Sequence, residues 1–265
     1  MNPLDKLSGE MDELLEGFMS HAIVGDTTVG LTNYIFWMCV ALALLLVCVL
    51  MFKKRQARGL VPQGIFVNGM EYVVEFVRDD MCKSILGDTW KRHFPFLAAI
   101  FFFIVCNSIV GVIPGCHPGT GTIGVTAALA FCSFTYFIVV GCKRMGVLGY
   151  IKSLAPKGVS FPMNVLVWAI ELVSTFLRLI TLAVRLFCNM FAGHVVMGTF
   201  AILASLFVEP LLQGFSAAAL GQAGASVFWV VLLIIIYLVE ILVGIIQAYV
   251  FTLLSAVYIQ LVESE

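Results

Sequence analysis

Residues 164–208 read NVLVWAIELVSTFLRLITLAVRLFCNMFAGHVVMGTFAILASLFV, a run in which apolar residues are broken by only a few charges. As a single helix, about 45 residues would measure ~65 Å, against the ~30 Å of a bilayer's hydrocarbon core. The run must therefore either fold back as a hairpin or cross the membrane at a steep tilt. It contains no proline, and Gly193 and Gly198 do not mark a turn, so we expect one long, tilted helix. Bilayer thickness alone does not impose such a tilt, which points to a protein partner.

Four further stretches are long and apolar enough to cross a membrane, namely 34–52, 94–114, 122–142 and 222–261. The last of them is as unusual in length as the first run, and we expect the two to pack as an antiparallel pair. The composition agrees, with 61% hydrophobic and 12% charged residues, where soluble domains carry about 25% charged residues. The mean hydropathy is +1.05. The sequence therefore predicts an all-α integral membrane protein with five membrane helices.

The segment 62–90 follows Pro62 and mixes apolar residues with acidic ones at helical spacing. This pattern is typical of an amphipathic helix that lies on the cytoplasmic membrane surface. We find no internal repeat and no flexible linker, so residues 1–265 are predicted to form a single membrane domain.

The loop charges predict the orientation, since Lys and Arg are retained on the cytoplasmic side. Eight of them lie in 53–93 and four in 143–163, whereas 115–121 and 209–221 have none. The acidic segment 1–33 is then outside and the C-terminus is cytoplasmic. This segment lacks the basic start of a signal peptide, and we predict a multi-pass protein of a bacterial inner (plasma) membrane.

Several classes of function are disfavoured by the sequence. The net charge of −1 gives no electrostatic reason to bind nucleic acid. The eight cysteines are scattered singly, so we expect buried small side chains and no disulfide or metal site. Residues 119–124 match G-x-G-x-x-G, but no strand precedes them, and there is no phosphate-binding P-loop. We therefore predict no nucleotide site and no cofactor.

Ionisable residues inside hydrocarbon are costly, which makes them functional candidates. At 100° per residue, five polar residues of the 164–208 run fall within roughly 40° of one line along the helix. They are Asn164, Glu171, Arg178, Arg185 and Asn189. His194 lies on another face, and Glu240 and Gln247 share a face of the last helix. In an antiparallel pair, Gln247 would lie at the level of Arg185 and Glu240 near that of His194.

Arg185 is predicted to lie at mid-membrane, where it cannot lose its charge. It needs a carboxylate partner, and Glu171 is about 14 residues, or ~21 Å, away along the same helix. We expect this partner to belong to another protein. The alternative is that Arg185 extends to the membrane surface or pairs internally with Glu240.

Three motifs carry a resemblance to a known family. The run Arg185–His194, RLFCNMFAGH, resembles the R-L-F-G-N-M-x-A-G-[EH] signature of ATP synthase subunit a. Glu171–Ser174 (ELVS) and Gln247–Phe251 (QAYVF) are similar to two further elements of that family, in the same order. The likeness covers about residues 62–261. Departures are Cys188 in place of glycine, Leu179 where a proline often stands, and the order Asn107-Ser108.

The resemblance implies a non-catalytic subunit of an F-type ATP synthase, with the two long helices lying along the rotor ring. Protons would enter from outside along Asn189, His194, Glu240 and Gln247, reach a carboxylate of the c-ring, and leave toward the cytoplasm along a path that includes Glu171. Arg185 would separate the two half-channels, and Arg178 would face the rotor. The implied partners are the c-ring, the peripheral-stalk subunit b and the other ATP synthase subunits.

Two other classes remain open at this point. A stand-alone secondary transporter or channel would also use intramembrane charges, although such proteins usually show internal repeats and broken helices. A membrane hydrolase would need a nucleophile with its base or a metal motif, and the sequence shows no such arrangement. Co-purification of a c-ring and ATPase subunits would separate the three classes.

Overall fold

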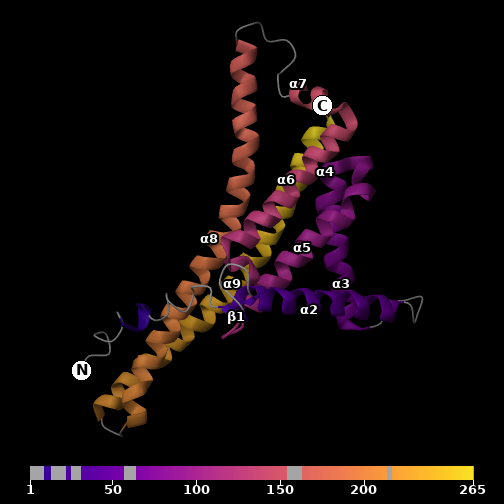
Figure 1. Cartoon of the computed structure of the whole chain (residues 1–265). Helices are drawn as coiled ribbons and strands as arrows, with labels where there is room; N and C mark the ends of the chain where they lie inside the picture. Colours follow the sequence, from indigo (N-terminus) through magenta and orange to yellow (C-terminus); the bar gives the residue numbers. More distant parts are fainter. Residues whose placement is uncertain are drawn as a thin grey trace.

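The computed structural model describes residues 9–12, 22–24, 31–56, 64–153, 163–213 and 217–264, which are almost entirely helical. Five helical runs among them are long and apolar enough to cross a membrane. Their long helices are α2 (Asn33–Gln56), α5 (Trp90–Val112), α6 (Ile123–Met145), α8 (Met163–Gln213) and α9 (Ala217–Ser264). The predicted all-α membrane fold is confirmed, and Figure 1 shows its arrangement.

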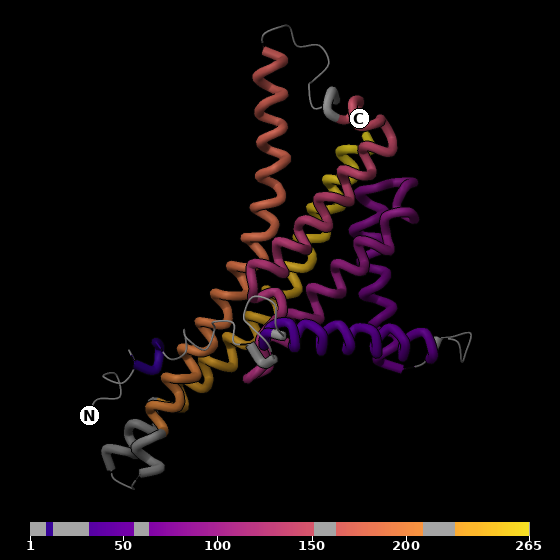
Figure 2. Tube along the Cα trace, viewed as in Figure 1, coloured from indigo at the N-terminus to yellow at the C-terminus, as the bar shows by residue number. Residues whose placement is uncertain are grey.

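The two longest helices pack against each other as an antiparallel pair, with no hairpin inside either of them. Figure 2 shows α8 and α9 running side by side toward the end they share, while the first turns of α8 stand away from α9. Near the shared end, Ser226 Oγ donates to the Ala204 carbonyl oxygen at 3.3 Å. Toward the other end, the Arg178 guanidinium lies 5.2 Å from the ring centre of Tyr258. The absence of an internal turn in either run predicted this pairing correctly.

Small residues and buried hydroxyls hold the bundle together, as is usual where lipid removes the hydrophobic drive between helices. A Cβ on Gly244 of α9 would lie 2.8 Å from the Cβ of Ser108 on α5, so only glycine permits this approach. Between α6 and α9, the hydroxyls of Ser133 and Ser255 form a buried hydrogen bond of 2.7 Å. These contacts set the rotation of α9 about its own axis, and therefore the direction in which its polar side chains point.

The predicted surface helix 62–90 is more broken than expected. It consists of α3 (Ile65–Glu75), a π-helix η2 (Phe76–Lys83), a single turn α4 (Ser84–Leu86) and a 3₁₀ turn η3 (Gly87–Thr89) that leads into α5. The wider π stretch buries Val77, Met81 and Cys82 together. Gly87 has φ 55°, a conformation that favours glycine, and it ends the first segment.

Several predicted boundaries are corrected by local backbone chemistry. The apolar run 94–114 belongs to a helix that spans Trp90–Val112. This helix ends before residue 114 because Ile113 precedes Pro114 and takes the extended conformation. The run 122–142 becomes Ile123–Met145 and ends at Gly146, whose φ is 76°. Likewise 34–52, 164–208 and 222–261 extend to 33–56, 163–213 and 217–264.

Short elements complete the described residues. Two strands that the sequence did not predict, β1 (Ala22–Val24) and β2 (Leu31–Thr32), pair antiparallel. A 3₁₀ turn η4 (Gly119–Gly121) precedes α6, and α7 (Val147–Ser153) follows it. Most of the segment 1–33, residues 57–63 and the centre of the loop 209–221 lie outside the described residues.

Many large apolar side chains of the membrane helices are exposed, for example Leu46 at 60% and Leu238 at 63%. In a membrane protein these faces meet lipid or partner helices instead of water. The expectation that all eight cysteines are buried is wrong. All eight are free thiols, but only Cys82 is buried, while Cys39, Cys132 and Cys188 are exposed. A lipid-facing position suits a small apolar thiol as well as a core position does.

A buried polar cluster ties the C-terminal end of α9 to α5 and α6. His93 is fully buried, with Nε2 3.0 Å from Glu263 Oε1 and Nδ1 3.0 Å from the Tyr136 hydroxyl. Thr89 Oγ1 donates to the other Glu263 oxygen at 2.5 Å. Four segments of the chain meet in this cluster.

We expect His93→Leu to destabilise the fold by about 2–3 kcal/mol, because it leaves Tyr136 and Glu263 without their buried partner. Thermal unfolding of the chain in mild detergent measures this loss. His93→Gln keeps two polar groups and is expected to lose less than half as much. Equal losses in the two variants would mean that packing, not hydrogen bonding, makes the contribution.

Candidate functional site

Arg185 lies near the middle of α8 on an exposed strip with Thr181, Val184 and Cys188. The opposite side of this turn, Leu182, Ala183 and Leu186, packs into the core. No hydrogen bond or ion pair joins the Arg185 guanidinium to any other described residue. A permanent charge is thus presented outward from the middle of an apolar helix.

Glu240 of α9 is buried, at 8% exposure, where α9 packs on α8. Its carboxylate packs directly on Gly193, where even a methyl group would overlap it. Gly193 is eight residues from Arg185, about 12 Å along the helix. The internal pair of Arg185 with Glu240 that the sequence left open is therefore not present.

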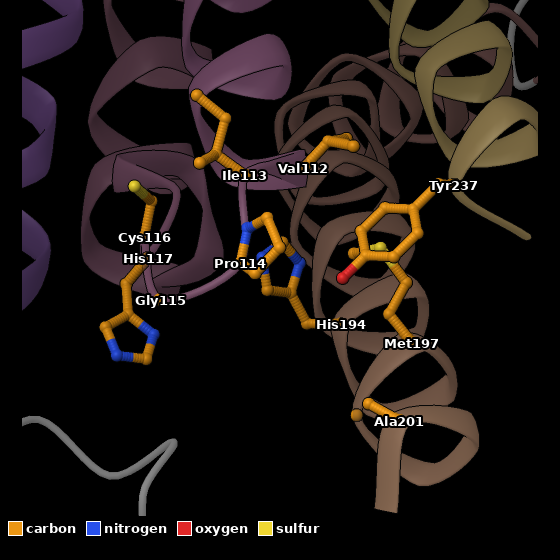
Figure 3. A pocket seen from close by; sticks show the side chains of 12 residues that line it. Val112, Ile113, Pro114, Gly115, Cys116, His117, His194, Met197, Ala201 and Tyr237 are labelled. Carbon is orange, nitrogen blue, oxygen red and sulfur yellow. The ribbon is translucent and has the colours of Figure 1, made fainter. Parts of the chain in front are cut away.

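His194 follows Gly193 and turns its ring toward the segment after α5. Its Nδ1 lies 3.0 Å from the Met190 carbonyl oxygen. A carbonyl only accepts, so the geometry assigns the ring proton to Nδ1. His194 also lines a cavity of about 200 Å³, together with residues 111–117 and Tyr237 of α9. Figure 3 shows this cavity with His194 on one wall and His117 on another.

Gln247 is buried on α9, two turns beyond Glu240. Glu240 packs on Gly193, and counting seven residues from this contact along an antiparallel pair would bring Gln247 to about the level of Leu186. Asn189 is half-buried on α8, one turn after Arg185. The contact of Glu240 with Gly193 agrees with the level near His194 predicted for Glu240, while the level of Gln247 stays a prediction.

Two buried polar atoms on this face of α9 have no hydrogen-bond partner among the described residues. They are Glu240 Oε1 and Gln247 Nε2. Buried polar groups are nearly always hydrogen-bonded to protein or water, so this face of α9 is suited to bind water or another polar ligand. Within the described ranges, no group of three or more His, Cys, Asp or Glu side chains is placed to hold a metal ion.

Glu171 and Arg178 pair with each other, two turns apart on α8. Arg178 Nη2 lies 2.9 Å from Glu171 Oε1, and Arg178 also stacks over Tyr258 of α9. Both side chains are partly exposed, so the ion pair itself contributes little stability. The structure brings these two together and keeps them apart from the Glu240 and His194 group.

Sequence reasoning missed three members of this region. His117 comes from a loop, and Tyr237 lies three residues before Glu240 on the same side of α9, so only the fold brings them to His194. Gly193 was read as part of a motif, whereas its role is to make room for the Glu240 carboxylate. The one sequence feature that could have indicated this close packing is a glycine next to a histidine inside a long apolar helix.

Comparison with known proteins gives one consistent result. Residues 35–260 match the family model described as ATP synthase A chain. "ATP synthase subunit a 2" of Prosthecochloris aestuarii is 34% identical over 250 residues, covering 93% of this chain and 72% of that protein. "ATP synthase subunit a" of Myxococcus xanthus is 33% identical over 251 residues, covering 94% and 77%. A third relative, from Chlorobium phaeobacteroides strain DSM 266, is 32% identical over 242 residues, covering 90% and 67%. With its motifs, its five apolar helices and this match in agreement, the chain belongs to the ATP synthase A chain family.

Proposed function

We propose that this chain is the stator subunit a of a rotary F-type ATP synthase and that it conducts protons to and from the rotor through two offset half-channels. The observation that carries the proposal is Arg185, a permanent charge exposed at mid-helix with no partner among the described residues. Within the membrane, such an arginine requires a carboxylate partner. The c-ring supplies one from each of its subunits in turn.

Arg185 has two tasks in this mechanism. Its positive charge favours the ionised form of an approaching rotor carboxylate, so the proton leaves toward the cytoplasm. The same charge repels protons and stops a direct leak between the half-channels. The membrane voltage can drive these proton transfers. Moving one charge across 100 mV is worth about 2.3 kcal/mol, which is comparable to a pKa shift of more than one unit.

The outer half-channel runs from the cavity beside His194 to the rotor. Glu240 and Gln247 line one side of it and His194 and Asn189 the other. Their support is the packing of Glu240 on Gly193 and the unsatisfied polar atoms of Glu240 and Gln247. Histidine suits a relay because its unperturbed pKa lies near physiological pH.

The cytoplasmic half-channel passes the Glu171–Arg178 pair. The Glu171 carboxylate offers a departing proton a polar contact on an otherwise apolar helix. Arg178, which stacks on Tyr258, marks the edge of this path, and its guanidinium lies within reach of the rotor side of α8. Glu171 is the last acidic group that a departing proton meets on α8.

The chain does not itself catalyse ATP chemistry. Its partners are the c-ring along α8 and α9, the peripheral-stalk subunit b and the remaining ATP synthase subunits, in a bacterial inner membrane. The acidic N-terminal segment lies outside, and the C-terminus is cytoplasmic, as the distribution of Lys and Arg supports.

Cys188 offers a direct test of the rotor contact, because it is exposed on the same strip as Arg185. We expect a chain with Cys188 as its only cysteine to form a disulfide with a cysteine introduced beside the rotor carboxylate. Disulfides need Cα atoms within about 7 Å, so only true neighbours react. The cross-link should stop ATP-driven proton pumping, and a reductant should restore it.

The matched control is a chain whose only cysteine is Cys39, which is also exposed but lies on α2. It is expected to leave the rotor uncross-linked. If Cys39 reacted with the rotor and Cys188 did not, the rotor would face another side of the bundle and the proposal would be wrong.

A further inference from the structure

The cavity beside His194 has a second histidine on its wall. Its volume is about 200 Å³, and His117 and Cys116 line it from the segment after α5, His194 and Met197 from α8, and Tyr237 from α9. Three separate parts of the chain thus meet around one space, and two of them supply an imidazole (Figure 3).

A smaller void links the same two histidines. Its volume is about 10 Å³, and Tyr34, His117, Met190, Phe191 and His194 are among its lining residues. This is about the space that one water molecule needs. The two imidazoles therefore border both the larger cavity and a site for a single bridging water.

The position of His117 is fixed by the backbone around it. A Cβ on Gly111 would lie 2.5 Å from the Cβ of Pro118, so only glycine lets Pro118 pack on the end of α5. Gly115 turns the chain with φ 83°. His117 lies between these two points, half-buried, with its ring centre 5.4 Å from that of Tyr34.

We infer that His117 is the first proton acceptor of the outer half-channel and passes protons to His194 through one bridging water. This rests on the proposed function and extends it. One imidazole nitrogen of His117 takes a proton from outer water while the other releases one to the bridging water. That water gives its own proton to His194, which hands one on to Glu240. Each proton taken up from a hydronium ion outside is matched by one released, and His117 returns to its starting tautomer by ring rotation before the next transfer.

The surroundings suit such a role, because among the residues that the structure describes no lysine or arginine lines either cavity. The titratable groups that face His117 are Tyr34 from α2, His194 from α8, Tyr237 from α9 and its neighbour Cys116. Beyond them lie Glu240, packed on Gly193, and the exposed Glu10 and Asp12, whose neighbour Met11 accepts a hydrogen bond from Thr199. An imidazole is the side chain whose unperturbed pKa lies nearest neutral pH.

The test is proton flux through the whole ATP synthase in proteoliposomes, measured against the pH on the His117 side. We expect His117→Asn to lower the flux about five- to tenfold at about pH 8.5, where protons are scarce, and less than about twofold at pH 6. Added imidazole should restore the loss. His117→Glu, which keeps a titratable group, should retain most of the flux and shows that the position tolerates substitution.

Met197→Leu, which changes the same cavity without a titratable group, is expected to leave the pH profile unchanged. An equal loss at every pH in His117→Asn, or no loss at all, would overturn the inference. Arg185→Ala in the same assay separates the two proposals. If it abolishes the coupled flux, measured as ATP synthesis, while His117→Asn has no effect, only the role of His117 is wrong.

Discussion

Glu240→Gln is expected to lower ATP-driven proton pumping about a hundredfold while the complex stays assembled, a loss typical of a missing proton-transfer group. Glutamine keeps the size of the side chain and its packing on Gly193, but it cannot take up and release a proton. The measurement is acidification of inverted membrane vesicles after addition of ATP. Pumping at the wild-type rate would remove Glu240 from the pathway.

The same prediction extends to the glycine beneath the carboxylate. Gly193→Ala should reduce pumping about tenfold, because the added methyl group displaces the Glu240 carboxylate from its place. Shortening the acid in the double variant Gly193→Ala/Glu240→Asp makes room again and should recover part of the rate. Gly124→Ala on α6 is the matched control, since a Cβ there meets nothing within 4 Å. A Gly193→Ala enzyme as active as this control would contradict the packing argument.

The helices could be predicted from the sequence because lipid allows few backbone conformations. A backbone in hydrocarbon must satisfy its own hydrogen bonds, so each long apolar run is a helix, and the lack of a break in 164–208 and 222–261 favoured unbroken helices over hairpins. The polar face of α8 followed from helical periodicity. The register of α8 against α9 followed from their antiparallel order, and the contact of Glu240 with Gly193 agrees with it.

What the sequence could not provide depends on contacts between distant segments. The cavity beside His194 is made by a loop, α8 and α9, and nothing in the spacing of His117 or Tyr237 relates them to His194. The π-helix Phe76–Lys83 also had no sequence signal, because its apolar positions resemble those of an ordinary amphipathic helix. The contact of Arg178 with Tyr258 joins two distant segments and could likewise not be predicted from the sequence.

Arg185→Ala is expected to abolish coupled proton transport. A unit charge about 4 Å from a carboxylate is worth about 4 kcal/mol at an effective dielectric constant of 20, which changes a protonation equilibrium by about a thousandfold. Without it, the rotor carboxylate keeps its proton as it passes α8. Arg185→Lys keeps a charge and should retain a small part of the activity, because lysine lacks the fixed planar fork of arginine.

The fold itself should tolerate the loss of this side chain. Arg185 is exposed and makes no hydrogen bond or ion pair with the other described residues, so its removal breaks no internal contact. A defect in Arg185→Ala can therefore be assigned to the rotor interface once assembly is verified by pull-down of the c-ring.

The decisive measurement is ATP-driven proton pumping in inverted vesicles that carry Arg185→Ala, beside the unaltered chain and with equal amounts of assembled complex. The account predicts that pumping falls to background while the complex remains intact. Pumping at the unaltered rate would contradict the central role of Arg185 and return the stand-alone transporter to consideration.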